Sequence, residues 1–136
     1  MFNPSLTTPI VAASVILLLS LDPFATASPI GGDAQRGKDV YQRCLGCHSL
    51  KINRTGPRHC GLLGRKAGTQ PGYNYSKAMT ESGITWTAET LDDFLTAPLK
   101  ALPGTSMGYA GVRSATDRAD LIAYLSTAMD GTVQCK

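Results

Sequence analysis

Residues 44–48 read Cys-Leu-Gly-Cys-His. Two thiols lie three positions apart, and an imidazole directly follows the second one. On a helical turn, this spacing brings both sulfurs to one edge of a porphyrin, where each can bond one vinyl group. The imidazole then lies beneath the iron and offers a nitrogen as an axial ligand. The pentapeptide therefore predicts one covalent haem c on Cys44 and Cys47, with His48 as an iron ligand.

Two other uses of a Cys-x-x-Cys pair fit the chain less well. A thioredoxin-like redox pair requires a βαβ pattern, and none is visible. A structural zinc site requires a second pair of ligands. The two remaining cysteines, Cys60 and Cys135, lie too far apart in the chain to form one. Haem attachment is the prediction that the motif favours.

The first 27 residues differ from the rest. Ile10–Leu21 is an apolar segment without charge, shorter than the roughly 20 residues that cross a bilayer. It is typical of the central region of a secretory signal, and the following Ala25-Thr26-Ala27 predicts cleavage before Ser28. Met1–Pro9 contains no Lys or Arg, which leaves an uncleaved anchor open. We expect a cleaved signal peptide at 1–27 and a periplasmic domain at 28–136.

Composition limits the class of protein. The chain has 136 residues, 43% hydrophobic and 17% charged, with a formal net charge of +3. These values are typical of one globular domain and argue against disorder or a multi-span membrane protein. The modest charge, without a supporting motif, argues against nucleic-acid binding. A domain of this size has a marginal core, and a buried haem would enlarge it.

The pattern of apolar residues predicts short helices and long loops. Residues 49–72 are rich in glycine and proline, as expected of a loop that wraps a flat cofactor. Helices are expected at 33–44 with Asp33 as the N-cap, at 75–81, from Thr87 until Pro98 ends the helix, and at 116–129 with Thr116 as the cap. The sequence thus predicts a small all-α fold around one covalent haem.

Several motifs resemble those of class I soluble cytochrome c of the mitochondrial and bacterial respiratory type. They are CLGCH at 44–48, TGP at 55–57, GLLGRKAG at 61–68, ITW at 84–86, PGTSMGYAG at 103–111 and RADLIAYL at 118–125. The resemblance extends from Gly32 to about Met129. It implies the cytochrome c fold and an electron-transfer protein rather than an enzyme.

The resemblance also implies roles for individual residues. Met107 corresponds to the sixth iron ligand, which gives His/Met coordination and a raised reduction potential. The Pro57 carbonyl would accept a proton from the second imidazole nitrogen of His48 and orient the ring. Phe94 stands where related proteins commonly carry a tyrosine that bonds the methionine sulfur. The other methionines considered, Met79 and Met129, are expected to fill the core.

Three residues resemble the group that bonds the buried haem propionates in this family: Arg65, Tyr75 and Trp86. Buried carboxylates need such partners because an unpaired buried charge is costly. For Tyr75 and Trp86, simple packing in the core is an alternative interpretation.

Cys60 and Cys135 remain after haem attachment. In an oxidising compartment two leftover cysteines usually pair, so we expect a disulfide between them, with two free thiols as the alternative. His59 is interpreted as an exposed or structural histidine, because both axial positions have better candidates.

These observations predict a monomeric, diffusible electron carrier that makes only transient contacts with redox proteins. Its donor would be a cytochrome bc complex or a dehydrogenase, and its acceptor an oxidase, a reductase or a reaction centre. A haem enzyme or sensor would need an open sixth position, against which the PGTSM segment argues. A dedicated partner of one enzyme stays open. Four residues form either a weak basic ring for acidic partners or a solvated face: Arg43, Arg54, Lys100 and Arg113.

Overall fold

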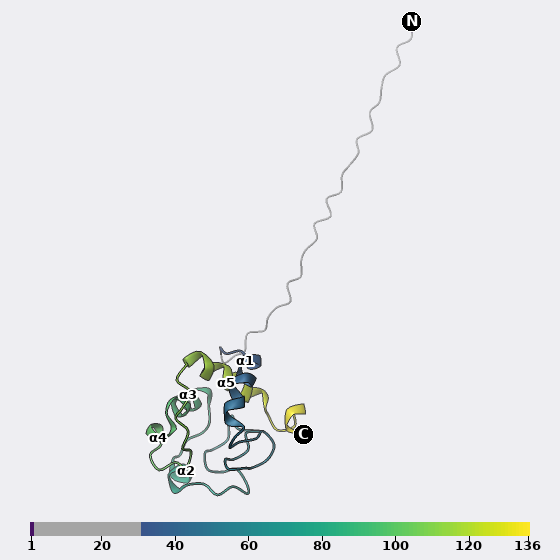
Figure 1. Cartoon of the computed structure of the whole chain (residues 1–136). Coiled ribbons are helices and arrows are strands. Elements are labelled where there is room, and N and C mark those ends of the chain that lie inside the picture. Colours follow the sequence, from purple (N-terminus) through teal and green to yellow (C-terminus); the bar gives the residue numbers. More distant parts are fainter. Residues whose placement is uncertain (2–30) are drawn as a thin grey trace.

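The computed structural model describes Met1 and residues 31–136. The predicted signal peptide, apart from Met1, lies outside the described residues. The helical elements, shown in Figure 1, are α1 (Ala34–Tyr41), η1 (Gln42–Cys44), α2 (Lys77–Glu81), α3 (Ala88–Thr96), α4 (Pro98–Ala101), α5 (Ala115–Thr127) and η2 (Val133–Cys135), where η denotes a 3₁₀ helix. Residues 31–136 contain no strand, only an isolated antiparallel bridge between Lys66 and Thr85. The predicted all-α class is confirmed.

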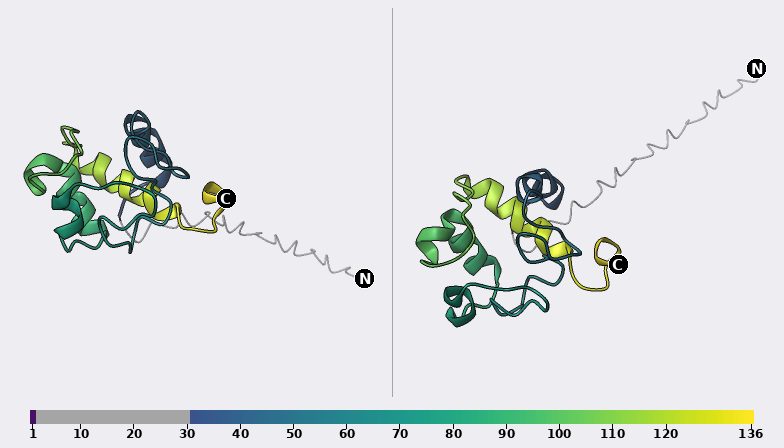
Figure 2. Two further views of the ribbon diagram at one scale, coloured as in Figure 1. Left: turned by 90° about the horizontal axis from the view of Figure 1, so that it is seen from below. Right: turned by 60° about the horizontal axis from the view of Figure 1, so that its bottom comes forward.

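Helix α5 is the centre of the arrangement. It packs against α1 on one side and against α3 on the other, and Figure 2 shows α5 between them in two further views. The long segment 45–76, which has no helix, runs around the same body. Within the described part of the chain, every helix is too short or too polar to cross a bilayer.

The start of α1 is fixed by its cap and by α5. The Asp33 carboxylate accepts hydrogen bonds from the amides of Gln35 and Arg36, at 2.8 and 3.0 Å, and so satisfies two of the free N–H groups of the first turn. In α5, the Asp120 carboxylate accepts bonds from the Arg36 guanidinium at 2.7 Å and the Asp33 amide at 2.6 Å. These bonds hold the pKa of Asp120 below its usual value. The predicted cap is confirmed, and it joins α1 to α5.

Gly37 lies where α1 crosses α5. A Cβ atom at this position would overlap the carbonyl oxygen of Asp120 and lie 2.9 Å from Cβ of Tyr124. One turn later, the ring of Tyr41 packs against that of Tyr124, with 5.3 Å between ring centroids. The helices approach this closely because residue 37 has no side chain.

We expect Gly37→Ala to lower the free energy of unfolding by about 1–3 kcal/mol, because the added methyl group forces the two helices apart. The change acts against the intrinsic preference of alanine for helices, about 1 kcal/mol. Denaturant unfolding of the haem-loaded protein measures the net change in the free energy of unfolding. Lys38→Ala is the control, because it places alanine at an exposed position of the same helix, away from the crossing. Equal stabilities of the two variants would contradict the close crossing.

Two helix starts differ from the prediction. Helix α2 begins at Lys77, because the Ser76 hydroxyl accepts a bond from the Met79 amide at 3.3 Å and acts as the cap. Helix α5 begins at Ala115, because its cap is Ser114, whose hydroxyl accepts from the Asp117 amide at 3.1 Å. The predicted cap at Thr116 is therefore wrong.

Helix α3 begins as predicted, and it ends before Pro98 as predicted. Thr87 caps it: its hydroxyl accepts a bond from the Thr90 amide at 3.2 Å, and the Thr90 hydroxyl accepts one from the Thr87 amide at 2.8 Å. The helix ends at Thr96, and Pro98 then opens the short α4. Proline suits a first helical position, where no N–H donor is needed. The sequence analysis missed α4.

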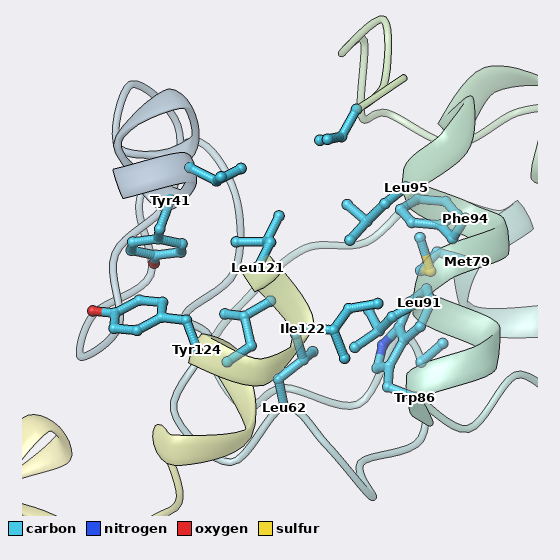
Figure 3. Close-up of a cluster of buried hydrophobic side chains, with 14 residues drawn as sticks. Tyr41, Leu62, Met79, Trp86, Leu91, Phe94, Leu95, Leu121, Ile122 and Tyr124 are labelled. Atoms are coloured by element: carbon cyan, nitrogen blue, oxygen red, sulfur yellow. The ribbon is translucent and has the colours of Figure 1, made fainter. Parts of the chain in front are cut away.

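The buried core combines α3, α5 and the adjacent loops. In Figure 3, side chains of α3 such as Leu91 and Phe94 stand on one side, and Leu121 and Tyr124 of α5 stand on the other. Met79 belongs to this cluster as predicted. Met129 is 45% exposed, so its predicted place in the core is wrong. It lies just beyond the end of α5, where the buried face of that helix stops.

Candidate haem-binding site

A cavity of about 510 Å³ opens between the helices. This size is typical of a site for a small molecule or cofactor. Its wall is formed by η1, the loops around residues 55–59 and 105–109, and the inner face of α3. The predicted site residues all line this cavity: Cys44, Cys47, His48, Pro57, Arg65, Tyr75, Trp86 and Met107.

The motif at 44–48 forms one tight turn. The amides of Cys47 and His48 both donate to the Cys44 carbonyl, at 3.0 and 2.8 Å. The turn brings both thiols and the imidazole to the cavity wall. Cys44 is half-buried and Cys47 is exposed. Burial raises the pKa of the Cys44 thiol to about 11.

His48 is oriented by the loop that follows it. Its Nδ1 lies 2.8 Å from the Pro57 carbonyl oxygen, and a carbonyl can only accept, so Nδ1 carries the proton. The lone pair of Nε2 is then free to ligate a metal ion. Burial lowers the pKa of His48, which favours this neutral form. Gly56 makes room for the ring, because a Cβ there would overlap His48.

Met107 reaches the cavity from the loop after α4. Its amide donates to the Thr105 hydroxyl at 3.3 Å, and Thr105 is buried. The loop is thus held against the protein body rather than extended into solvent. Met107 is half-buried and lines the same cavity as His48.

The residues present fit haem c. Two thiols at the spacing of the attachment motif, a neutral imidazole and a thioether border one largely apolar cavity. Phe94, Trp86 and Leu91 supply aromatic and aliphatic surface for a flat macrocycle. Among the described residues, no group of three or more His, Cys, Asp or Glu side chains is placed to hold a metal ion.

The three predicted propionate partners all line the cavity. The Arg65 guanidinium donates to the carbonyls of Cys60 and Arg58, at 3.1 and 2.9 Å, and to the Gln70 side chain at 2.6 Å. These bonds fix its position within the loop. Burial lowers the pKa of Arg65 and raises that of the nearby Tyr75.

Trp86 is held by its backbone and its ring. Its amide donates to the Arg65 carbonyl at 3.0 Å, and its carbonyl accepts from the Gly64 amide at 2.8 Å. Its ring packs against Phe94 with 5.1 Å between centroids. Trp86 is buried, so it belongs to the core and to the cavity wall at once.

Sequence reasoning missed Gln70 and Tyr73, and it placed His59 only as an exposed or structural histidine. Gln70 is buried and bonds Arg65. Tyr73 lines the cavity, donates to the Thr55 carbonyl at 2.6 Å, and packs edge-on against Tyr75 at 4.7 Å. His59 stacks on the ring of His48, with centroids 4.2 Å apart. Burial holds the pKa of His59 well below its ordinary value, and His48 and Arg65 add to this effect. The sequence signal for these residues was their residue type: amide and aromatic side chains within a loop that is expected to wrap a cofactor.

The structure joins Cys60 and Cys135 in a disulfide, with their Cα atoms 5.8 Å apart. Cys60, which follows His59 in the chain, is fully buried. The Gly61 amide also donates to the Ala128 carbonyl at 2.8 Å, and Arg58 pairs with Asp130 at 3.3 Å. These links join the loop behind His48 to the C-terminal tail.

Two members of the suggested basic ring have partners inside the protein. Arg43 pairs with Asp117 at 2.8 Å. The guanidinium of Arg54 donates to the Leu45 carbonyl at 2.7 Å. The charge of Arg43 is thus partly neutralised, and the guanidinium of Arg54 is turned toward the backbone. Both effects weaken the ring's attraction for acidic partners.

Known proteins resemble this chain over most of its length. A sequence model of the family described as cytochrome c matches residues 34–129. Cytochrome c type-1 of Ascaris suum is 48% identical over 97 residues, 69% of this chain and 87% of that protein. Cytochrome c2 of Rhodomicrobium vannielii is 42% identical over 99 residues, 71% of this chain and 79% of that protein. Among solved structures, cytochrome cH from Methylobacterium extorquens matches with a TM-score of 0.69 and 39% identity, over 71% of this chain and 99% of that one.

Proposed function

Because the chain belongs to the cytochrome c family, as a soluble class I member, we propose that it carries single electrons in the periplasm through a haem c ligated by His48 and Met107. Family membership establishes the electron-transfer role, and it sets the protein apart from enzymes. It also establishes haem c, with its iron, as the cofactor. The ligands, the location and the partners are the proposed part.

One observation carries the ligand assignment: His48 and Met107 approach the same cavity from different segments of the chain. When bound, haem c supplies a one-electron ferric/ferrous couple. The protein holds the imidazole neutral and oriented through Pro57. It presents Met107 from a loop held by the buried Thr105. His48 and Met107 together would hold the iron on both faces of the haem, which would leave no position for oxygen or peroxide.

The visible spectrum of the purified holoprotein tests this assignment. Low-spin ferric iron with the weak far-red band of methionine–iron bonding, and a sharp α band on reduction, are expected. Carbon monoxide should leave the reduced spectrum unchanged. A high-spin ferric spectrum that changes with carbon monoxide or peroxide would mean an open sixth position and would overturn His/Met ligation.

The periplasmic location rests on the amino-terminal sequence. The apolar segment Ile10–Leu21 and the Ala25-Thr26-Ala27 pattern support export and cleavage. Mass spectrometry of protein from the periplasmic fraction should find Ser28 as the first residue. A cell-bound protein that retains residues 1–27 would instead indicate an uncleaved anchor.

We propose redox proteins as partners: a cytochrome bc complex or a dehydrogenase as donor, and an oxidase, a reductase or a reaction centre as acceptor. Contacts of electron carriers are small and short-lived, typically below about 1,200 Å². The protein is proposed to act as a monomer. Because Arg43 and Arg54 have internal partners, electrostatic steering is expected to be modest.

A further inference from the structure

The side chain of His59 is placed directly on the proposed axial ligand. The rings of His48 and His59 are stacked, with centroids 4.2 Å apart and planes inclined by 23°. They are the two histidines of the chain. His59 also contacts Tyr41: its Nδ1 lies 3.2 Å from the Tyr41 hydroxyl, and the two rings meet edge-on with 5.7 Å between centroids.

The backbone around His59 is held at several points. Its amide donates to the Ser49 carbonyl at 3.0 Å, and the next amide, of Cys60, donates to the Leu50 carbonyl at 2.8 Å. Ser49 directly follows His48, so these two bonds tie the segment after His48 to the segment that carries His59. The disulfide to Cys135 then fixes the same loop to the C-terminal tail. The stacked ring therefore has little freedom to move away from His48.

The bond from His48 to Pro57 leaves one motion of the imidazole unopposed. A hydrogen bond in the ring plane fixes the direction of the Nδ1–H group, at 2.8 Å from its acceptor. The bond resists rotation of the ring about the Nδ1–H···O axis only weakly, because the donor atom stays in place during this rotation. A second ring lying face-on blocks this rotation by direct contact.

We propose that His59 is a positioning residue that sets the plane of the His48 imidazole, and that Tyr41 holds His59 in place. The inference rests on the proposed function, because it assumes that His48 ligates the iron. It deepens that function, since the plane of an axial imidazole determines how its π orbitals meet those of the iron. The orientation of the plane affects both the electronic structure of the ferric iron and its reduction potential.

Two substitutions at position 59 separate stacking from other effects. His59→Leu and His59→Phe both remove the bond to Tyr41, but only phenylalanine retains an aromatic face. In the ferric holoprotein, the hyperfine-shifted haem methyl resonances in the proton NMR spectrum report the plane of the axial imidazole. We expect a changed pattern and a shifted midpoint potential for His59→Leu, and a much smaller change for His59→Phe, which keeps the aromatic face and loses only the bond to Tyr41.

Tyr41→Phe tests the same inference with the stacked ring retained. Loss of the hydroxyl leaves His59 Nδ1 without this partner. We therefore expect the haem methyl pattern and the midpoint potential to change in the same direction as in His59→Leu, but by less. Tyr124→Phe is the matched control: it removes a hydroxyl from the ring that packs on Tyr41 at 5.3 Å and should leave the pattern unchanged. Far-UV circular dichroism verifies that each variant is folded.

Equal methyl patterns and potentials in the wild type and His59→Leu would overturn the inference. Equal changes in the leucine and phenylalanine variants would also overturn it, because the aromatic face would then be irrelevant. If His59→Leu does not fold, an unchanged Tyr41→Phe spectrum overturns it. Failure of the proposed ligation is distinct, since the wild type itself would then lack a low-spin His/Met spectrum.

Discussion

Met107→Ala is expected to abolish the far-red band of ferric methionine–iron bonding completely. Alanine has no donor atom, so the sixth position opens to water or to added ligands. The reduction potential should fall, because a thioether ligand favours ferrous iron. Carbon monoxide should then bind the reduced variant, in contrast to the wild type. Absorption spectroscopy and a redox titration of the holoprotein measure these changes.

Met129→Ala is the matched control for this experiment. Met129 is 45% exposed beyond the end of α5, and it does not line the cavity. Its loss should leave the spectrum and the potential unchanged. A far-red band that survives in Met107→Ala would show that another group ligates the iron, and Met79, which also lines the cavity, would be the next candidate.

Cys135→Ser is expected to lower the free energy of unfolding by about 4 kcal/mol, on the chain-entropy model for a closed loop of this length. The bridge spans 75 residues, so opening it restores much conformational freedom to the unfolded chain. The substitution changes a half-buried position and leaves the fully buried Cys60 in place. Denaturant unfolding of the haem-loaded variant, compared with the wild type, measures the loss.

A thiol count accompanies the stability measurement. Denatured wild-type holoprotein should contain no reactive thiol, and Cys135→Ser should contain one. Chemical reduction of the wild type should reproduce the loss of stability. Two reactive thiols in the untreated wild type, or an unchanged unfolding midpoint in the variant, would contradict a stabilising bridge.

The parts of the site that the sequence predicts are local. The turn at Cys44–His48 depends on bonds between residues three or four apart. The bond from His48 to Pro57 closes a loop of only nine residues. Caps such as Asp33 and Thr87 act within the first turn of their helices. Interactions of this range leave a recognisable spacing in the chain.

The parts that were missed depend on contacts between distant segments. Ser114 and Thr116 are both suitable caps, and local preference does not separate them. The choice is coupled to Arg118, which pairs with Asp92 of α3 at 2.7 Å and donates to the Val112 carbonyl at 2.9 Å. A helix that starts at Ala115 places Arg118 to make both contacts.

The contacts of His59 and Gln70 were hidden for the same reason. Both residues lie in a segment without helix or strand periodicity, so no pattern indicates which way each side chain points. Their positions follow from the backbone path of the loop, which Leu50 and Ala128 hold through hydrogen bonds with Cys60 and Gly61.

The distance between Cys60 and Cys135 along the chain has a consequence for biosynthesis. A ribosome adds Cys135 75 residues after Cys60, when Cys44, Cys47 and Cys60 have already been made. Four thiols allow three pairings, and the pairing between 60 and 135 is unavailable until Cys135 has been added. Loading Cys44 and Cys47 with haem would remove both competing thiols. The bridge between Cys60 and Cys135 is then the one disulfide that the four cysteines can still form, so haem attachment itself directs the pairing.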